Sequence, residues 1–160
     1  MLREGQIAMS QRIYLVIMDE TDEAKAALRF AARRAVRTTG AVHILALVPQ
    51  QEFVAFGGVQ ATIEEEARDR AEVLAMTAAG SLASESGLTP VIAVRQGDGP
   101  KVVREYLGEH PEVSALVLGA AGGSNPGPLV SHFAGIAGQL PCPLMIVPGA
   151  ISDQEIDRFS

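Results

Sequence analysis

Short apolar runs alternate along this chain with longer stretches in which apolar residues recur at every third or fourth position. The runs are typical of buried strands, and the periodic stretches are typical of amphipathic helices. The expected strands span 12–18, 42–48, 90–95, 114–118 and 144–147. The expected helices run from a cap at Thr21 to Gly40, from the end of a long 49–59 connection to about Ser86, over 99–109 and over 128–139.

This alternation predicts an α/β fold with one open, five-stranded parallel sheet, right-handed crossovers and helices on both faces. At 160 residues, the chain fits a single domain. We expect a flexible N-terminal segment over 1–11, the α/β domain over 12–148, and a polar C-terminal tail over 149–160 that includes a short helix.

Composition narrows the class of protein. A formal net charge of −6 argues against a nucleic-acid partner, which normally meets a basic face. The apolar runs are too short to span a membrane, and residues 1–11 lack the core of a signal peptide, so we expect a cytoplasmic protein. The single cysteine, Cys142, excludes an internal disulfide, and its position between two prolines favours a small buried hydrophobe over a nucleophile.

The strongest candidate for a ligand site is the loop that follows the fourth expected strand. Gly119 ends this strand, Gly122, Gly123 and Gly127 follow, and a helix opens near Pro128. In this arrangement free backbone N–H groups and a helix dipole converge on an anion, usually a phosphate. The loop lacks both the Gly-Lys-Ser/Thr ending and the GxGxxG spacing, so a simple strand-to-helix turn is the alternative.

A second candidate, Asp19, follows the first expected strand. Ligands of such sheets bind at the carboxyl ends of strands where the strand order reverses, and a carboxylate there accepts hydrogen bonds from a ribose or an adenine amino group. The alternative is a carboxylate that only stabilises a helix start. The neighbouring Glu20, Asp22 and Glu23 make a metal site conceivable without specifying one.

Charge near the glycine loop is unfavourable for a triphosphate. The sequence contains no Lys or Arg between Arg104 and Arg158. A triphosphate would depend on backbone amides, the helix dipole, His132, a divalent cation such as Mg²⁺, or a basic group from elsewhere such as Lys101. We therefore expect weak or altered phosphate affinity.

The 49–59 connection carries Phe53 and Phe56 beside a glycine pair. Exposed aromatic residues on a long loop are typical of a lid or of a contact with a protein partner. The alternative is that both rings fold back onto the core.

Four segments together resemble the universal stress protein family: 14–19, the long second helix, 117–122, and 140–147 with its Pro-Cys-Pro followed by an apolar run. The resemblance covers 12–148. It implies a five-stranded parallel α/β sheet, a homodimer and, in one subset of the family, ATP held between strands 1 and 4.

The resemblance also implies a set of nucleotide-binding residues. Gly119 and Gly122 match the first two glycines of the family's ATP motif, and Asp19 matches its strand-1 aspartate. Leu47 falls where an apolar residue packs near adenine. Alignment on Pro-Cys-Pro makes Ser131 the phosphate-contacting hydroxyl, with a loop two residues shorter and Val130 in place of a glycine.

We therefore expect a regulatory module that binds ATP or another adenine nucleotide, with or without Mg²⁺, and that has no catalytic residues. One alternative is a dimeric interaction protein of the same fold that binds no nucleotide. A weaker alternative is a slow ATPase.

Overall fold

The computed structural model describes residues 11–49 and 57–160. Its centre is a five-stranded parallel sheet with the order β3-β2-β1-β4-β5. The strands are β1 (Ile13–Met18), β2 (Ala41–Pro49), β3 (Val91–Gly97), β4 (Ala115–Ala120) and β5 (Leu144–Pro148). The open parallel α/β sheet expected from the sequence is therefore confirmed.

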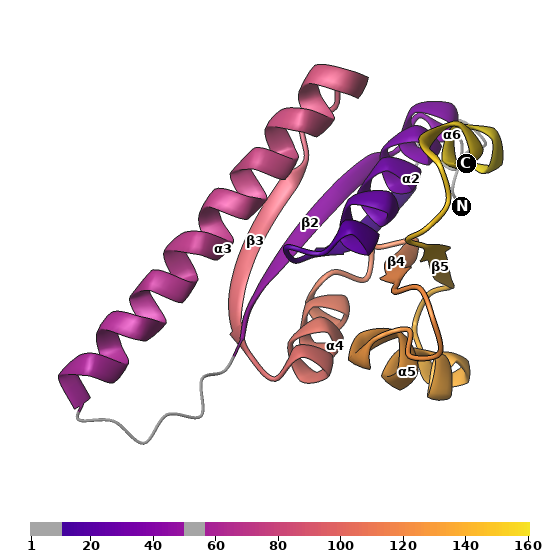
Figure 1. Cartoon of the computed structure of the whole chain (residues 1–160). Coiled ribbons are helices and arrows are strands. Elements are labelled where there is room, and N and C mark those ends of the chain that lie inside the picture. The colour runs from indigo at the N-terminus through magenta and orange to yellow at the C-terminus, as the bar shows by residue number, and fades with distance from the viewer. Residues whose placement is uncertain (1–10, 50–56) are drawn as a thin grey trace, which may run out of the picture.

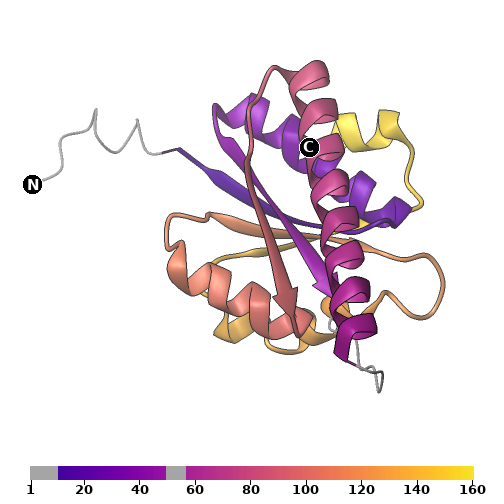
Figure 2. The same cartoon turned by 90° about the vertical axis from the view of Figure 1, so that its left-hand side faces the viewer.

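Helices cover both faces of the sheet (Figures 1 and 2). One face carries α2 (Asp22–Thr38), α3 (Gly57–Ser86) and α6 (Asp153–Phe159). The other face carries α4 (Gly99–Glu109), α5 (Pro128–Gly135) and the short 3₁₀ helix η1 (Ala137–Gln139). Within the two described ranges, no helix has both the length and the apolar character needed to cross a bilayer.

The alternation of side chains along β1 divides the core into two layers. Tyr14, Val16 and Met18 pack with α2, and Leu15 and Ile17 pack on the opposite face with α4 and α5. All five side chains are buried, as expected for a central strand covered on both faces.

Several element boundaries differ from the sequence-based expectation. α3 begins at Gly57, inside the expected connection, and β2 extends to Pro49. Phe53 and Phe56 lie outside the described residues. The expected 128–139 helix ends at Gly135 and gives way to η1, in keeping with the low helix propensity of the glycines in this stretch.

The last residues of the chain form α6, which packs against α2. Ile156 is buried between the two helices, and Ser152 caps α6 through a reciprocal pair of hydrogen bonds with Glu155. The Arg29 guanidinium donates to both carboxylate oxygens of Asp157, at 3.0 and 2.9 Å. This bidentate contact holds the pKa of the Asp157 carboxyl below its usual range. The short helix expected within the 149–160 tail is therefore present, and it packs against α2.

The buried side chain of His43, a residue of β2, points toward α4. His43 Nδ1 is 2.7 Å from the Tyr106 hydroxyl, and the Tyr106 ring stacks on His110 with centroids 4.1 Å apart. His110 Nδ1 in turn lies 2.9 Å from Glu112 Oε1, within hydrogen-bond distance. Burial, together with nearby His110, lowers the pKa of His43, so His43 is neutral at physiological pH.

The end of α2 generates a stability prediction. Thr39, not Gly40, adopts the left-handed conformation that caps this helix, with φ of 53°. Because a side chain is strained there and Thr39 is exposed, Thr39→Gly should raise the free energy of unfolding by about 0.5–1 kcal/mol. Gly40→Ala should lower it, since a Cβ at Gly40 would lie 2.4 Å from the Arg12 carbonyl oxygen. Urea unfolding measures both changes, and a stabilising Gly40→Ala would contradict this account.

The neutral His43 generates a pH prediction. A histidine with a lowered pKa binds its proton more weakly in the folded chain than in the unfolded chain. Its contribution to stability is therefore complete above about pH 6.5 and is lost as the pH falls below that value. Unfolding measured from pH 7.5 to 5 should show this loss, and His43→Gln should show less of it. Equal slopes for the two proteins would show that His43 is not responsible.

Candidate functional site

The strand order places one site at the centre of the sheet. From β1 the chain moves outward through β2 to β3, and it returns to the other side of β1 with β4. The carboxyl ends of β1 and β4 are therefore the point at which the order reverses, where ligands of open parallel sheets bind. Asp19 follows β1, and the loop 121–127 follows β4.

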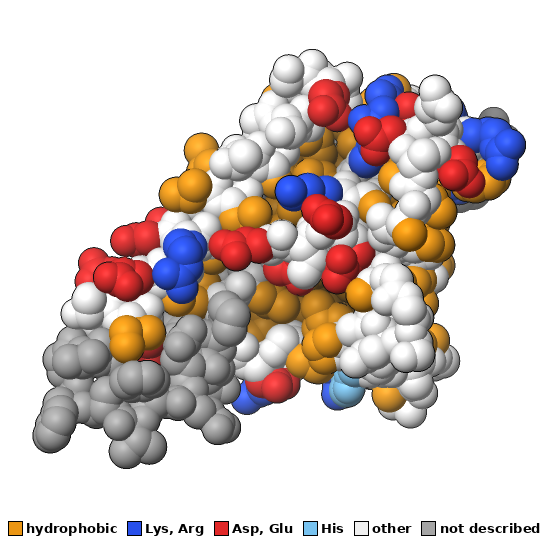
Figure 3. All heavy atoms as spheres, in the orientation of Figure 1, with side chains coloured by type: hydrophobic (Ala, Val, Ile, Leu, Met, Phe, Trp, Pro, Cys, Tyr) orange, Lys and Arg blue, Asp and Glu red, His pale blue; other side chains and the backbone are white. Residues whose placement is uncertain are grey.

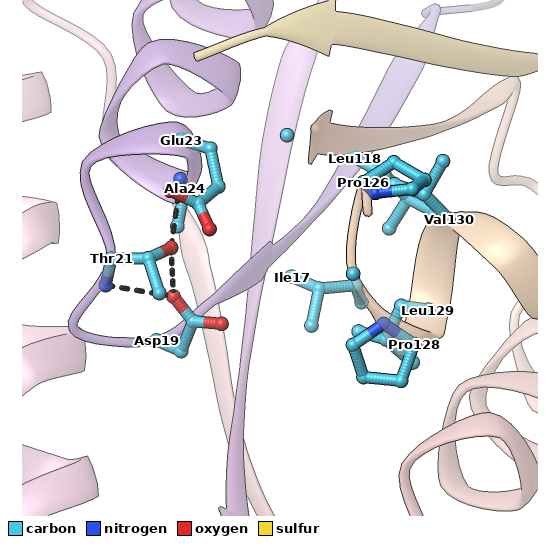
Figure 4. Close-up of a pocket in the computed structure, with 12 residues that line it drawn as sticks. Ile17, Asp19, Thr21, Glu23, Ala24, Leu118, Pro126, Pro128, Leu129 and Val130 are labelled. Atoms are coloured by element: carbon cyan, nitrogen blue, oxygen red, sulfur yellow. Dashed lines mark hydrogen bonds between the residues drawn. The ribbon is translucent and has the colours of Figure 1, made fainter. Parts of the chain in front are cut away.

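The turn after β1 fixes the direction of the Asp19 side chain. Asp19 Oδ1 accepts hydrogen bonds from the Thr21 backbone N–H, at 2.9 Å, and from the Thr21 hydroxyl. Thr21 Oγ1 accepts a further bond from Ala24 N–H at 3.2 Å and so caps α2. The second oxygen of Asp19 points away from this network, toward the side where Ile17 and Pro128 lie (Figure 4). One carboxylate oxygen thus orients the side chain and the other faces the hollow.

Two hydrogen bonds donated by backbone N–H groups and two glycines with positive φ determine the shape of the loop after β4. Ala121 N–H donates to the Pro126 carbonyl at 3.1 Å, and Gly127 N–H donates to Asn125 Oδ1 at the same distance. Gly123 and Gly127 have φ values of 92° and 106°, which side chains rarely adopt. No side chain caps the start of α5, so the first-turn amides of Leu129 and Val130 are without a capping side chain.

Gly119 has a different role from the loop glycines. A Cβ at Gly119 would lie 1.9 Å from the Glu23 carbonyl oxygen, and one at Gly149 would lie 2.6 Å from the Glu23 Cβ. The first turn of α2 therefore packs directly against two backbone segments, one at the end of β4 and one just after β5. At Gly122 a Cβ would meet nothing within 4 Å. Close packing requires Gly119 to be glycine, and packing does not require this of Gly122.

Two hollows meet at Asp19. The first, about 160 Å³, lies between the α2 and α5 sides of the site (Figure 4). Its lining residues are Ile17, Asp19, Thr21, Glu23, Ala24, Leu118, Gly119, Pro126, Gly127, Pro128, Leu129 and Val130. The second, about 200 Å³, lies against α3 and is lined by Asp19, Glu20, Leu47, Ala67, Arg70, Ala71 and Leu74. Each is smaller than the ~300–1,000 Å³ pockets that enclose a drug-sized ligand, so a nucleotide would extend across both.

The residues expected from the sequence separate into two groups. Asp19 lines both hollows, Gly119 lines the first and Leu47 lines the second. Gly122 and Ser131 are exposed and line neither hollow. Val130, the residue in place of the family's glycine, is 6% exposed and forms part of the wall of the first hollow.

Two further charged side chains line the site: Glu23, which the sequence offered only as part of a conceivable metal site, and Arg70, which the sequence did not single out. Glu23 lines the first hollow from the first turn of α2, and Arg70 lines the second from α3. Glu23 carried a usable signal, because it lies in the first turn of the helix that starts just after Asp19. Arg70 carried none, because its place depends on how α3 packs along β2 and β3.

Negative charge dominates the first hollow. Asp19 and Glu23 line it, and none of its twelve described lining residues is Lys, Arg or His. Red acidic side chains gather over the start of α2 in the space-filling view (Figure 3). Lys101, Arg104 and His132 line a separate hollow between α4 and α5.

Other chemical candidates in the sequence do not join this site. Among residues 11–49 and 57–160, no three His, Cys, Asp or Glu side chains lie close enough to hold a metal ion. Burial raises the pKa of the Cys142 thiol, and its side chain packs against the core on the α4 and α5 face. That environment fits a structural residue, since a reactive thiol needs a lowered pKa.

The family model for the universal stress protein family matches residues 9–148, which is most of the chain. The chain belongs to this family. No curated protein sequence matches it significantly.

Solved structures of the family share its fold. Universal stress protein UspA from Lactobacillus plantarum is 22% identical, with a TM-score of 0.72, over 85% of this chain and 97% of that one. A family protein from Arabidopsis thaliana with AMP bound is 18% identical, with a TM-score of 0.58, over 86% and 91%. The Archaeoglobus fulgidus protein in complex with dAMP is 17% identical, with a TM-score of 0.57, over 86% and 97%.

The two glycines after β4 provide a matched pair of variants. Gly119→Ala should lower the free energy of unfolding by about 2 kcal/mol or more, because the added methyl group collides with backbone. Gly122→Ala should change it by less than about 0.5 kcal/mol, since that position is exposed and open. Chemical denaturation of both variants measures the difference. Equal effects would show that α2 does not depend on the Gly119 contact.

Proposed function

We propose that this universal stress protein is a regulatory module that binds the adenosine part of an adenine nucleotide at the carboxyl ends of β1 and β4. The observation that carries the proposal is the Asp19 carboxylate. One of its oxygens is held by Thr21, and the other faces a hollow at the point where the strand order reverses. A fixed acceptor in this position suits a ribose hydroxyl or an adenine amino group.

The lining of the two hollows supports this ligand class. Ile17, Leu118 and Leu129 offer apolar surface on one side of Asp19, and Leu47, Ala71 and Leu74 offer it on the other. Ligand sites commonly combine a mostly apolar lining with a few polar groups that fix orientation. The AMP and dAMP complexes of similar proteins add support from the same fold.

Isothermal titration calorimetry with adenosine, AMP, ADP and ATP tests the proposal, with and without Mg²⁺. We expect binding of at least one of these compounds. We also expect Asp19→Ala to weaken it about tenfold or more, the usual effect of losing a hydrogen bond to a charged group. Asp98→Ala is the matched control, because Asp98 also accepts from a backbone N–H at a helix start but lies outside both hollows. No heat with any compound at millimolar concentration would overturn the proposal.

One feature favours a second function, that of a dimeric interaction protein without a nucleotide. β5 is an edge strand of the sheet, and Ile146 on it is 42% exposed. An unpaired edge strand with an exposed apolar side chain is a surface on which a second chain can pair. The calorimetric titration separates the two functions, because this second one requires that no adenine compound binds.

A further inference from the structure

The adenine-binding site proposed above has a charge distribution that opposes phosphate. Resting on that proposed function, we infer that the site selects its ligand by charge, with uncharged adenosine favoured over AMP, and AMP favoured over ADP and ATP. Glu23 is the residue that sets this order.

Packing against the backbone holds the first turn of α2, and with it Glu23, in place. The Glu23 carbonyl oxygen approaches Gly119 closely, and its Cβ approaches Gly149. The side chain starts from this fixed point and lines the first hollow from the α2 side, opposite Pro126 and Val130 (Figure 4). A phosphate near the glycine loop would therefore face the Glu23 carboxylate across the hollow.

The positive contributions to the site are smaller than the negative ones. The N-termini of α2 and α5 each contribute about half an elementary charge, and this effect decreases within the first turn. α5 is also short, and its first residue, Pro128, has no N–H to offer. Asp19 and Glu23 contribute a full negative charge each when ionised, and both line a hollow of only about 160 Å³. The field in the hollow is therefore negative.

Within the part of the chain that the structure describes, the cations that line the neighbouring hollows do not reverse this balance. Arg70 lines the second hollow, where the carboxylates of Asp19 and Glu20 lie with it. Lys101 and Arg104 line the separate hollow on the α4 side. The sequence of segment 50–56 contains Glu52 and no Lys or Arg, so this segment cannot supply a cation to the site.

The size of the effect follows from Coulomb's law. In so small a hollow, a phosphate would lie on the order of the Debye length of about 8 Å or less from each carboxylate, so salt screens the repulsion only in part. We expect each added phosphate charge to weaken binding by about three- to tenfold. Adenosine avoids this repulsion and keeps the contacts with Asp19 and the apolar walls.

Calorimetric titration of the full chain with adenosine, AMP, ADP and ATP in EDTA tests the inference, with a parallel series in Mg²⁺. We expect affinity to decrease in that order in both series. Glu23→Gln should strengthen AMP and ATP binding by about three- to tenfold and should change adenosine binding by less than about twofold. Asp22→Asn is the matched control, because this exposed neighbour loses the same charge outside both hollows, and it should change each affinity by less than about twofold.

The outcomes separate this inference from the proposed function. If ATP binds more tightly than adenosine in either series, charge selection is wrong and the adenine site remains. If adenosine is favoured but Glu23→Gln leaves the order unchanged, Glu23 does not set it and the inference is overturned. If no compound binds, the adenine site itself is wrong.

Discussion

The close contact between the first turn of α2 and the backbone of β4 is the constraint on which this site depends. Gly119 has no room for a side chain, because the Glu23 carbonyl oxygen lies where a Cβ would be. Gly149, just after β5, accommodates the Glu23 Cβ in the same way. Three segments that are far apart in the sequence are therefore held together at one point. Asp19 and Thr21 precede this turn by only a few residues, so the contact places them beside β4, and the hydrogen bonds from Thr21 then set the direction of the Asp19 side chain.

α2 is held from its other side as well. Arg29 and Arg33 both pair with Asp157 of α6, at 2.9 and 3.2 Å, and Arg37 donates to the backbone carbonyls of Asp157 and Ser160. The bonds join parts of the chain more than 100 residues apart, so they act on the tertiary structure and not only on the helix. α2 is consequently fixed between the sheet and α6, which limits how far the Asp19 turn can move relative to β4.

The elements and their arrangement could be predicted from the sequence, because buried strands and amphipathic helices have different periods and because parallel strands connect in one hand. The placement of a ligand between strands 1 and 4 was implied by the family resemblance, and the strand order itself comes from the structure. The docking of α6 was missed although a signal existed: Arg29, Arg33 and Arg37 lie four residues apart on one helix face, and Asp153 and Asp157 do so on another.

The role of Gly119 could not be predicted, because glycines required by packing and glycines required by a turn look the same in a sequence. Only the position of Glu23 in space separates Gly119 from Gly122.

The glycine loop can keep its shape independently of phosphate. Its two residues with positive φ, Gly123 and Gly127, are required by the turn itself, and the Ala121–Pro126 and Gly127–Asn125 hydrogen bonds close it without a ligand. A phosphate cradle needs in addition close backbone approach and local positive charge. Here Val130 fills part of the wall and Glu23 lies across the hollow from it. The loop is therefore shaped by its own turn, and the α2 contact places the Glu23 carboxylate across the hollow from it, which is the arrangement behind the charge selection that we infer.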